Sequence, residues 1–86
     1  MEIIFSKRFS KKYDKLSKGL KEKFKLKLIV FSNDIKDPIL NIHSLHGSYD
    51  GFYSFNVNAD YRVIFRYAEI EIVELVMIGT HSELYK

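Results

Sequence analysis

Histidine, hydroxyl and tyrosine side chains lie close together near the end of this sequence, directly after two strongly apolar stretches. The run from Asp60 to Tyr85 reads DYRVIFRYAEIEIVELVMIGTHSELY, and Gly79-Thr80-His81 follows its second apolar stretch. Imidazole suits proton transfer because its ordinary pKa lies near neutral. The run therefore predicts a reaction site or a phosphate site, and we expect the rest of the chain to position it.

The spacing of polar residues brings further side chains to His81. Arg62 follows Asp60 by two residues, so both lie on the same face of a strand. If the chain turns at Ala68-Glu69, the start of one strand lies beside the end of the next. Asp60, Arg62 and His81 then share one corner of a sheet. The planar fork of arginine suits phosphate, and Tyr85 could stack on a base or donate a proton.

Each of these residues also has a plainer interpretation. A carboxylate and an arginine two residues apart on one strand face, such as Asp60 and Arg62, usually form a surface ion pair. A histidine after a strand is most often a partly exposed loop residue, and Gly79 more often permits a turn. His43 and His46 lie in an irregular segment without a carboxylate at a recognisable spacing, so we expect no metal and no cofactor.

Hydrophobic periodicity predicts the elements that position this corner. Residues 1–5 are typical of a strand, and Ser6 is a candidate N-cap for a helix. Gly19 is predicted to break or cap that helix, and a second helix runs from Leu20 until Asn33-Asp34 and then Asp37-Pro38 end it. Residues 39–49 are irregular. Residues 52–57, 61–67 and 70–78 are predicted strands, and the last of them is central because both of its faces are apolar.

The predicted fold is α+β, with the order β-α-α-β-β-β in a single domain over residues 1–86. The last three strands are joined by short turns and should form an antiparallel meander. The two helices should form a hairpin that buries its apolar stripes against one face of this small, mainly antiparallel sheet.

Composition narrows the class of protein. Hydrophobic residues make up 47% of the 86 residues, which favours a folded globule. The absence of cysteine excludes disulfides, thiolate zinc sites and cysteine nucleophiles, and it is compatible with a reducing cytosol. Neither a signal-peptide pattern nor a membrane-length apolar run is present. A soluble cytoplasmic protein is therefore expected.

Positive charge is concentrated in the N-terminal part of the chain. Residues 1–36 carry eleven Lys or Arg against four acids, a net charge of +7, whereas residues 37–86 carry three against seven, a net charge of −4. A basic half raises the local concentration of polyanions. The same lysines could equally be an ordinary solvated helix surface.

Four segments of the sequence resemble the RelE/ParE superfamily of bacterial toxins, and within it the YafQ-like and RelE-like ribosome-dependent mRNA endonucleases. These segments are His43-Ser44-Leu45-His46-Gly47, Gly51-Phe52-Tyr53, DYRVIF at residues 60–65 and IGTHSELY at residues 78–85. The resemblance spans the chain, and its ending GTHSELY is the most specific part. It implies a toxin that enters the ribosomal A site, cleaves mRNA and is neutralised by a cognate antitoxin.

The resemblance also implies roles for individual residues. His81 corresponds to a catalytic acid/base, and His43 corresponds to the histidine before the Leu-x-Gly. Asp60 corresponds to the acid that opens the next strand, and Tyr85 to the terminal aromatic.

Two positions depart from the YafQ-like pattern. Asn56 replaces a second sheet histidine, and Met77 replaces an arginine two residues before the glycine of the ending. Arg62 is our candidate for the missing cation.

The mechanism that the resemblance implies needs no metal. The ribose 2′-OH attacks its own 3′-phosphate, with His81 as principal acid/base and His43 or Asp60 as its opposite number. Arg62 would hold the phosphate and Tyr85 would orient the nucleotide. The residues expected to bind the ribosomal RNA backbone are Lys7, Lys11, Lys12, Lys15, Lys18, Lys21, Lys23, Lys25, Lys27 and Arg66.

The antitoxin is expected to contribute an acidic, hydrophobic segment. The strand face that bears Arg62, Ile64 and Arg66 mixes charge with apolar surface, and such a segment could fold onto it.

Two other functions remain open at this stage. A toxin of the same fold could inhibit DNA gyrase, as ParE-like relatives do, and would then arrest replication rather than translation. A catalytically weak homologue could act mainly as an antitoxin partner and co-repressor, and Asn56 and Met77 keep that alternative open.

Overall fold

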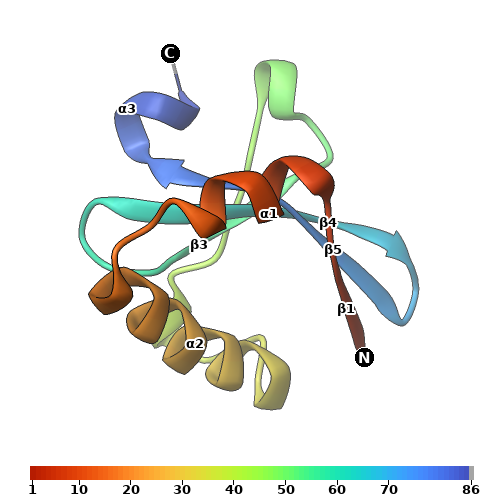
Figure 1. Ribbon diagram of the computed structural model, residues 1–86. Helices are drawn as coiled ribbons and strands as arrows, with labels where there is room; N and C mark the ends of the chain where they lie inside the picture. Colours follow the sequence, from red (N-terminus) through yellow and green to blue (C-terminus); the bar gives the residue numbers. More distant parts are fainter. Residues whose placement is uncertain (86) are drawn as a thin grey trace.

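The computed structural model describes residues 1–85, and five strands form one sheet in the order β1-β5-β4-β3-β2 (Figure 1). Lys86, the last residue of the predicted domain and tail, lies outside the described residues. The strands are β1 Glu2–Phe5, β2 His43–Ser44, β3 Tyr53–Asn56, β4 Tyr61–Glu69 and β5 Ile72–Thr80. The helices are α1 Lys7–Asp14, α2 Lys18–Asn33 and α3 His81–Leu84, with 3-10 turns η1 Pro38–Leu40 and η2 Gly47–Tyr49.

The sheet confirms the predicted α+β class and the antiparallel meander. β3, β4 and β5 pair antiparallel in sequence, and β1 adds to the far side of β5 as the only parallel neighbour among the described strands. β5 therefore lies inside the sheet, as its two apolar faces predicted. A strand flanked on both sides tolerates few polar side chains.

The first helix ends earlier than predicted, and the predicted break at Gly19 is wrong. Lys15 is the C-cap of α1, and the Ser17 hydroxyl caps α2 by accepting a hydrogen bond from the Leu20 amide at 3.2 Å. Gly19 lies inside the first turn of α2. Serine decides the boundary because its side chain satisfies an amide that the helix start leaves free, whereas glycine there is only tolerated. At the other helix start, Ser6 does cap α1, as predicted.

The hairpin between β4 and β5 turns two residues later than predicted. β4 runs to Glu69 and β5 begins at Ile72, so the turn is Ile70-Glu71 rather than Ala68-Glu69. The far end of β5 shifts as well, because Gly79 and Thr80 still belong to the strand. β4 extends beyond its predicted end to Glu69, whereas β5 keeps its predicted length and is displaced by two residues, because the ladder continues wherever backbone groups face a partner.

Two short elements complete the sheet and its covering. His43–Ser44, within the segment predicted to be irregular, forms the edge strand β2 against β3. Near the end of the described residues, His81–Leu84 form α3, a single helical turn; the sequence predicts a short tail with one helical turn over residues 82–86, so the helix begins one residue earlier.

Alternation along the strands divides the sheet into two faces. One face packs against the helices in a core of aromatic and branched side chains. The helices meet each other through Phe24, whose ring centroid lies 5.5 Å from Phe9 and 5.2 Å from Tyr13. On the opposite face Ser54, Ile64 and Leu84 are buried, although they lie outside that core. The members of the main core are Phe9, Phe24, Phe31, Leu40, Phe55, Val57, Val63, Phe65, Val73, Leu75 and Ile78.

Candidate functional site

A pocket on the sheet face opposite the main core gathers most of the predicted site residues. Its volume is about 390 Å³, which falls within the range of small-ligand sites. His43, Arg62, His81 and Tyr85 all contribute to its lining, so the corner predicted from the sequence exists as a shared hollow. The full lining consists of Asn41, His43, Leu45, Ser54, Arg62, His81 and Tyr85.

Strand register explains why these residues meet. His43 pairs with Ser54 across β2 and β3, which aligns the edge strand with the floor of the pocket. Arg62 pairs with Asn56 on one side and with Gly79 on the other. Because alternate residues of a strand share a face, Ser54 and Arg62 both lie on the face away from Phe55 and Val63.

The short helix α3 delivers the other two side chains. Its first amide, from His81, donates to the carbonyl of Asp60 at 3.0 Å, which fastens the start of α3 to the start of β4. The Tyr85 ring meets the His81 ring edge-on with centroids 4.7 Å apart. Tyr49 meets Tyr85 from the other side at 6.1 Å, so the imidazole lies at one end of an aromatic row.

Arg62 keeps its charge available to the pocket. Its Nη1 donates to the Ala59 carbonyl at 3.3 Å. The three ion pairs found within residues 1–85 involve neither Arg62 nor Asp60, so the plainer interpretation of these two as a surface ion pair is wrong. A guanidinium that no carboxylate neutralises can bind an incoming anion.

Asp60 is placed differently from the other predicted site residues. It is exposed and is not among the residues that line the pocket. Its backbone carbonyl, rather than its carboxylate, makes the contact to His81. The structure therefore brings four of the five predicted side chains together and leaves the Asp60 carboxylate outside the lining.

Tyr49 is a site residue that the sequence did not single out. Its ring packs against Phe52 at 6.2 Å and Tyr85 at 6.1 Å, and its hydroxyl donates to the Met77 sulfur at 3.7 Å. Figure 1 shows the green segment that carries η2 standing next to α3. A tyrosine inside a predicted turn carried no periodic signal that could have placed it there.

The two positions that depart from the YafQ-like pattern have distinct surroundings. Asn56 lies beside Arg62, and within residues 1–85 its buried Oδ1 has no hydrogen-bond partner. Met77 contributes to a small pocket of about 160 Å³ that Arg8 and Lys12 also line. Arg8 is thus a candidate for the missing cation in addition to Arg62, and the sequence pattern gave no reason to choose it.

The whole sequence, residues 1–86, matches the family described as bacterial toxin of type II toxin-antitoxin system, YafQ. The chain belongs to this family. Among curated protein sequences, none matches it significantly.

Solved structures of other toxins share the fold of this YafQ-family chain. YafQ from Escherichia coli strain BL21(DE3) is 22% identical with a TM-score of 0.79, over 99% of this chain and 98% of that one. YafQ in the Escherichia coli DinJ-YafQ complex is 23% identical with a TM-score of 0.76, over 99% and 97%. A YoeB/ParE toxin from Agrobacterium tumefaciens is 15% identical with a TM-score of 0.78, over 94% and 99%.

The basic residues of this YafQ-family chain fall into two groups. Four have partners: Lys12 bonds Glu83, Lys27 bonds the Asn56 carbonyl, Arg66 bonds Glu74, and Lys21 lies over the Tyr13 ring. The exposed remainder of the predicted RNA-binding set consists of Lys7, Lys11, Lys15, Lys18, Lys23 and Lys25.

The strand face predicted to receive an antitoxin segment does not offer apolar surface. Ile64 is 0% exposed, and Arg66 is held by Glu74 at 2.8 Å. This face therefore offers less apolar surface than a strand-by-strand alternation of residues indicates.

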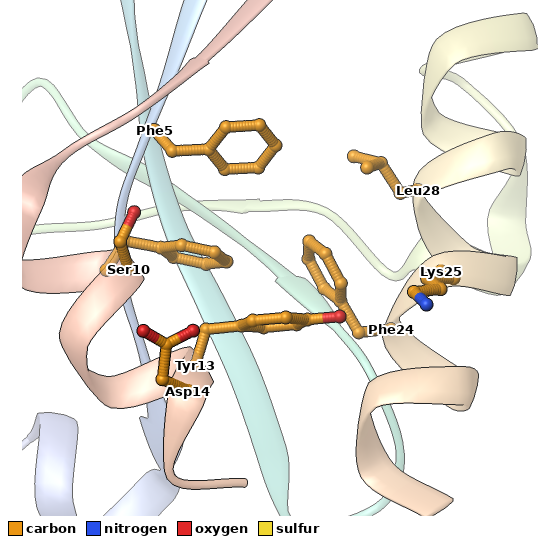
Figure 2. Close-up of a pocket in the computed structure, with 8 residues that line it drawn as sticks. Phe5, Ser10, Tyr13, Asp14, Phe24, Lys25 and Leu28 are labelled. Carbon is orange, nitrogen blue, oxygen red and sulfur yellow. The ribbon is translucent and has the colours of Figure 1, made fainter. Parts of the chain in front are cut away.

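A second hollow lies on the helix side of the sheet (Figure 2). It measures about 340 Å³ and opens between α1 and α2, where Phe5, Tyr13, Phe24 and Leu28 face one another. Phe5 is 48% exposed, which is unusual for a phenylalanine. The full lining consists of Phe5, Phe9, Ser10, Tyr13, Asp14, Phe24, Lys25 and Leu28. We name this hollow the helix groove.

Within residues 1–85, no group of three His, Asp or Glu side chains could hold a metal ion. In the same part of the chain, no helix is long and apolar enough to cross a membrane.

Proposed function

We propose that this YafQ-family toxin is a ribosome-dependent endoribonuclease that cleaves mRNA and thereby arrests translation in the cytoplasm. The observation that carries the proposal is the convergence of two imidazoles and an unpaired guanidinium, from His43, His81 and Arg62, in one pocket. Two groups that exchange protons near neutral pH and one fixed cation are the parts that phosphodiester cleavage by an internal hydroxyl requires.

The reaction proceeds by in-line transfer at phosphorus. The ribose 2′-OH loses its proton to one imidazole and its oxygen bonds to the adjacent phosphorus. The bond from phosphorus to the leaving 5′-oxygen breaks, and the other imidazole protonates that oxygen. The products are a 2′,3′-cyclic phosphate and a 5′-hydroxyl. The side chains supply every proton transfer, so the step is written without a metal.

Each residue of the pocket has one role in this scheme. His81 is the principal acid/base, and His43, which also lines the pocket, is the second acid/base. Asp60 is left outside because its carboxylate does not line the pocket. Arg62 holds the phosphoryl oxygens, where negative charge accumulates in the transition state. Tyr85 stacks on or orients the nucleotide and keeps the His81 ring in place.

The ribosome contributes the binding surface that the pocket lacks. The exposed lysines of α1 and α2 contact ribosomal RNA backbone, which makes association salt-sensitive. Lys12, Lys21, Lys27 and Arg66 contribute less than predicted because each already has a partner.

A cognate antitoxin neutralises the toxin, as expected for a member of a type II system, and the helix groove is its docking surface. Escherichia coli YafQ is solved with DinJ in such a complex. An amphipathic, acidic antitoxin segment fits the groove because the lining is aromatic and the surrounding residues 1–36 carry a net charge of +7.

The decisive experiment measures cleavage of mRNA on programmed ribosomes. Wild type should give codon-phased cuts by primer extension, with cyclic-phosphate and 5′-hydroxyl ends. His81→Ala should lower the rate by about 10²- to 10⁴-fold, the usual contribution of a general acid or base. A known active toxin serves as the positive control.

Two results would overturn the proposal. His81→Ala could cleave as fast as wild type, which removes the assigned role. Wild type could leave mRNA intact while cells stop growing. Replication arrest would then indicate gyrase inhibition, and an effect limited to operator control would indicate the co-repressor alternative, which Asn56 and Met77 keep open.

A further inference from the structure

We infer that Glu83 is a positioning residue: it clamps α3 to the sheet and to α1, and so fixes the His81 and Tyr85 side chains in the pocket. This inference rests on the proposed function for its effect on catalysis. Its structural part, the placement of the two rings, stands independently.

Both carboxylate oxygens of Glu83 are used. Oε1 accepts a hydrogen bond from the Thr80 amide at 2.8 Å, and Oε2 accepts one from the Lys12 ammonium at 2.6 Å. The Thr80 hydroxyl in turn accepts from the Glu83 amide at 3.1 Å, which completes a capping box. One side chain therefore joins the end of β5, the start of α3 and the last turn of α1.

The electrostatics agree with this geometry. The hydrogen bond from Lys12, followed by that from the Thr80 backbone, lowers the pKa of Glu83 from 4.5 to about 2. The carboxylate is therefore charged at neutral pH, which is the form that both donors need.

Gly79 allows α3 to lie this close to the strand. A Cβ placed on Gly79 would stand 3.2 Å from Glu83 Oε1 and 3.4 Å from Leu84 Cδ2. A side chain there would force the Glu83 carboxylate to shift by a few tenths of an ångström from its place against the Thr80 amide, and it would contact the buried Leu84. The Gly-Thr-His-Ser-Glu-Leu-Tyr ending is thus a packing and capping unit, and His81 and Tyr85 are the two residues that it presents.

A helix of four residues needs such fastening. Helices this short do not form alone, because nucleation costs more than one turn of hydrogen bonds returns. His81 is the first residue of α3 and Tyr85 follows its last. Any loosening of the clamp therefore moves both rings, and catalysis is sensitive to displacements of about 1 Å.

The test compares variants of full-length protein by NMR and by single-turnover cleavage. Glu83→Ala removes both bonds, and we expect contacts between the His81 and Tyr85 rings to weaken and kcat to fall by at least about 10-fold. KM should change by less than about 3-fold, since the exposed lysines are untouched. Glu83→Gln keeps an acceptor for Thr80 and should lie between wild type and Glu83→Ala.

Glu71→Ala is the matched control, because it removes the same charge from an exposed turn at the opposite end of β5. It should leave the rings and kcat unchanged. Unaltered ring contacts in correctly folded Glu83→Ala would overturn the inference, as would altered contacts with full kcat. If wild type itself cleaves nothing, the proposed function fails, while the ring contacts still decide whether Glu83 positions α3.

Discussion

The pocket and the helix groove lie on opposite faces of the same sheet and are built in different ways. The pocket draws His43, Arg62 and His81 from three separate elements and presents polar atoms. The helix groove is lined mainly by aromatic and aliphatic side chains from α1, α2 and the end of β1, such as Phe5 and Leu28. The pocket depends on strand register, since a slip of one residue would turn Arg62 to the other face. The groove depends on helical periodicity alone.

This difference indicates a division of labour between the two faces. Converging polar groups suit catalysis, because they stabilise a transition state when they are held in the correct orientation. Exposed aromatic surface suits the binding of a protein partner, because burying that surface at an interface is favourable. A toxin that keeps the two apart can change its partner specificity without disturbing its chemistry. α1 touches both regions, since Phe9 lines the groove and Lys12 holds Glu83.

Among the substitutions that separate the two regions, removal of the Arg62 guanidinium from the pocket should cause the largest loss of activity. We expect Arg62→Ala to lower kcat/KM for ribosome-bound mRNA by about 10²- to 10³-fold, as loss of one preorganised donor to a developing oxyanion does elsewhere. Arg62→Lys should recover only part of this, because an ammonium lacks the planar fork. Affinity for the antitoxin, measured by calorimetry, should stay unchanged for both. A large loss of antitoxin affinity would mean that the two faces are not separate.

Substitution in the helix groove should weaken antitoxin binding and leave cleavage unchanged. The expected effect is smaller than that of removing Arg62. We expect Phe5→Ser to weaken antitoxin binding by about 10-fold, because an aromatic anchor contributes at least about 1 to 2 kcal/mol at an interface. Cleavage by the free variant should equal wild type. Ile70→Ser is the control, since Ile70 is 93% exposed and lies in the β4–β5 turn away from the groove. Equal losses from both variants would argue for a general effect of surface hydrophobicity.

The sequence predicted the elements of both regions better than their edges. Period-two alternation in β4 and helical spacing in α2 reflect burial, which is a strong and local signal. The predicted proximity of Arg62 and His81 depended on one antiparallel hairpin. That prediction was correct although the turn lies two residues later than expected. The corner is kept because β4 ends two residues later and β5 moves by two residues, and an even displacement leaves every side chain on its predicted face of the sheet.

Contacts made by long-range packing could not be predicted in this way. Tyr49 joins the site through a loop whose path depends on the whole sheet. Lys12 looked like another solvated lysine, yet it bonds a carboxylate 71 positions along the chain. The complete burial of Ile64 likewise depends on segments from outside its own strand. The capping box of Thr80 and Glu83 is a local pattern, but its effect on His81 depends on how α3 is fastened to α1 and β5.

Acid should loosen the link between the two regions, and this is the smallest effect that we predict. The folded pKa of Glu83 is about 2, below its ordinary 4.5, so its contribution is present above about pH 4.5 and is lost as pH falls toward 2. The Thr80 amide donates directly to this carboxylate, so its proton chemical shift should follow the titration, with an inflection near pH 2. Glu83→Gln cannot ionise and should abolish that inflection. An inflection near pH 4.5 in wild type would show that Lys12 does not hold the carboxylate, and α1 would then be linked to α3 only through packing.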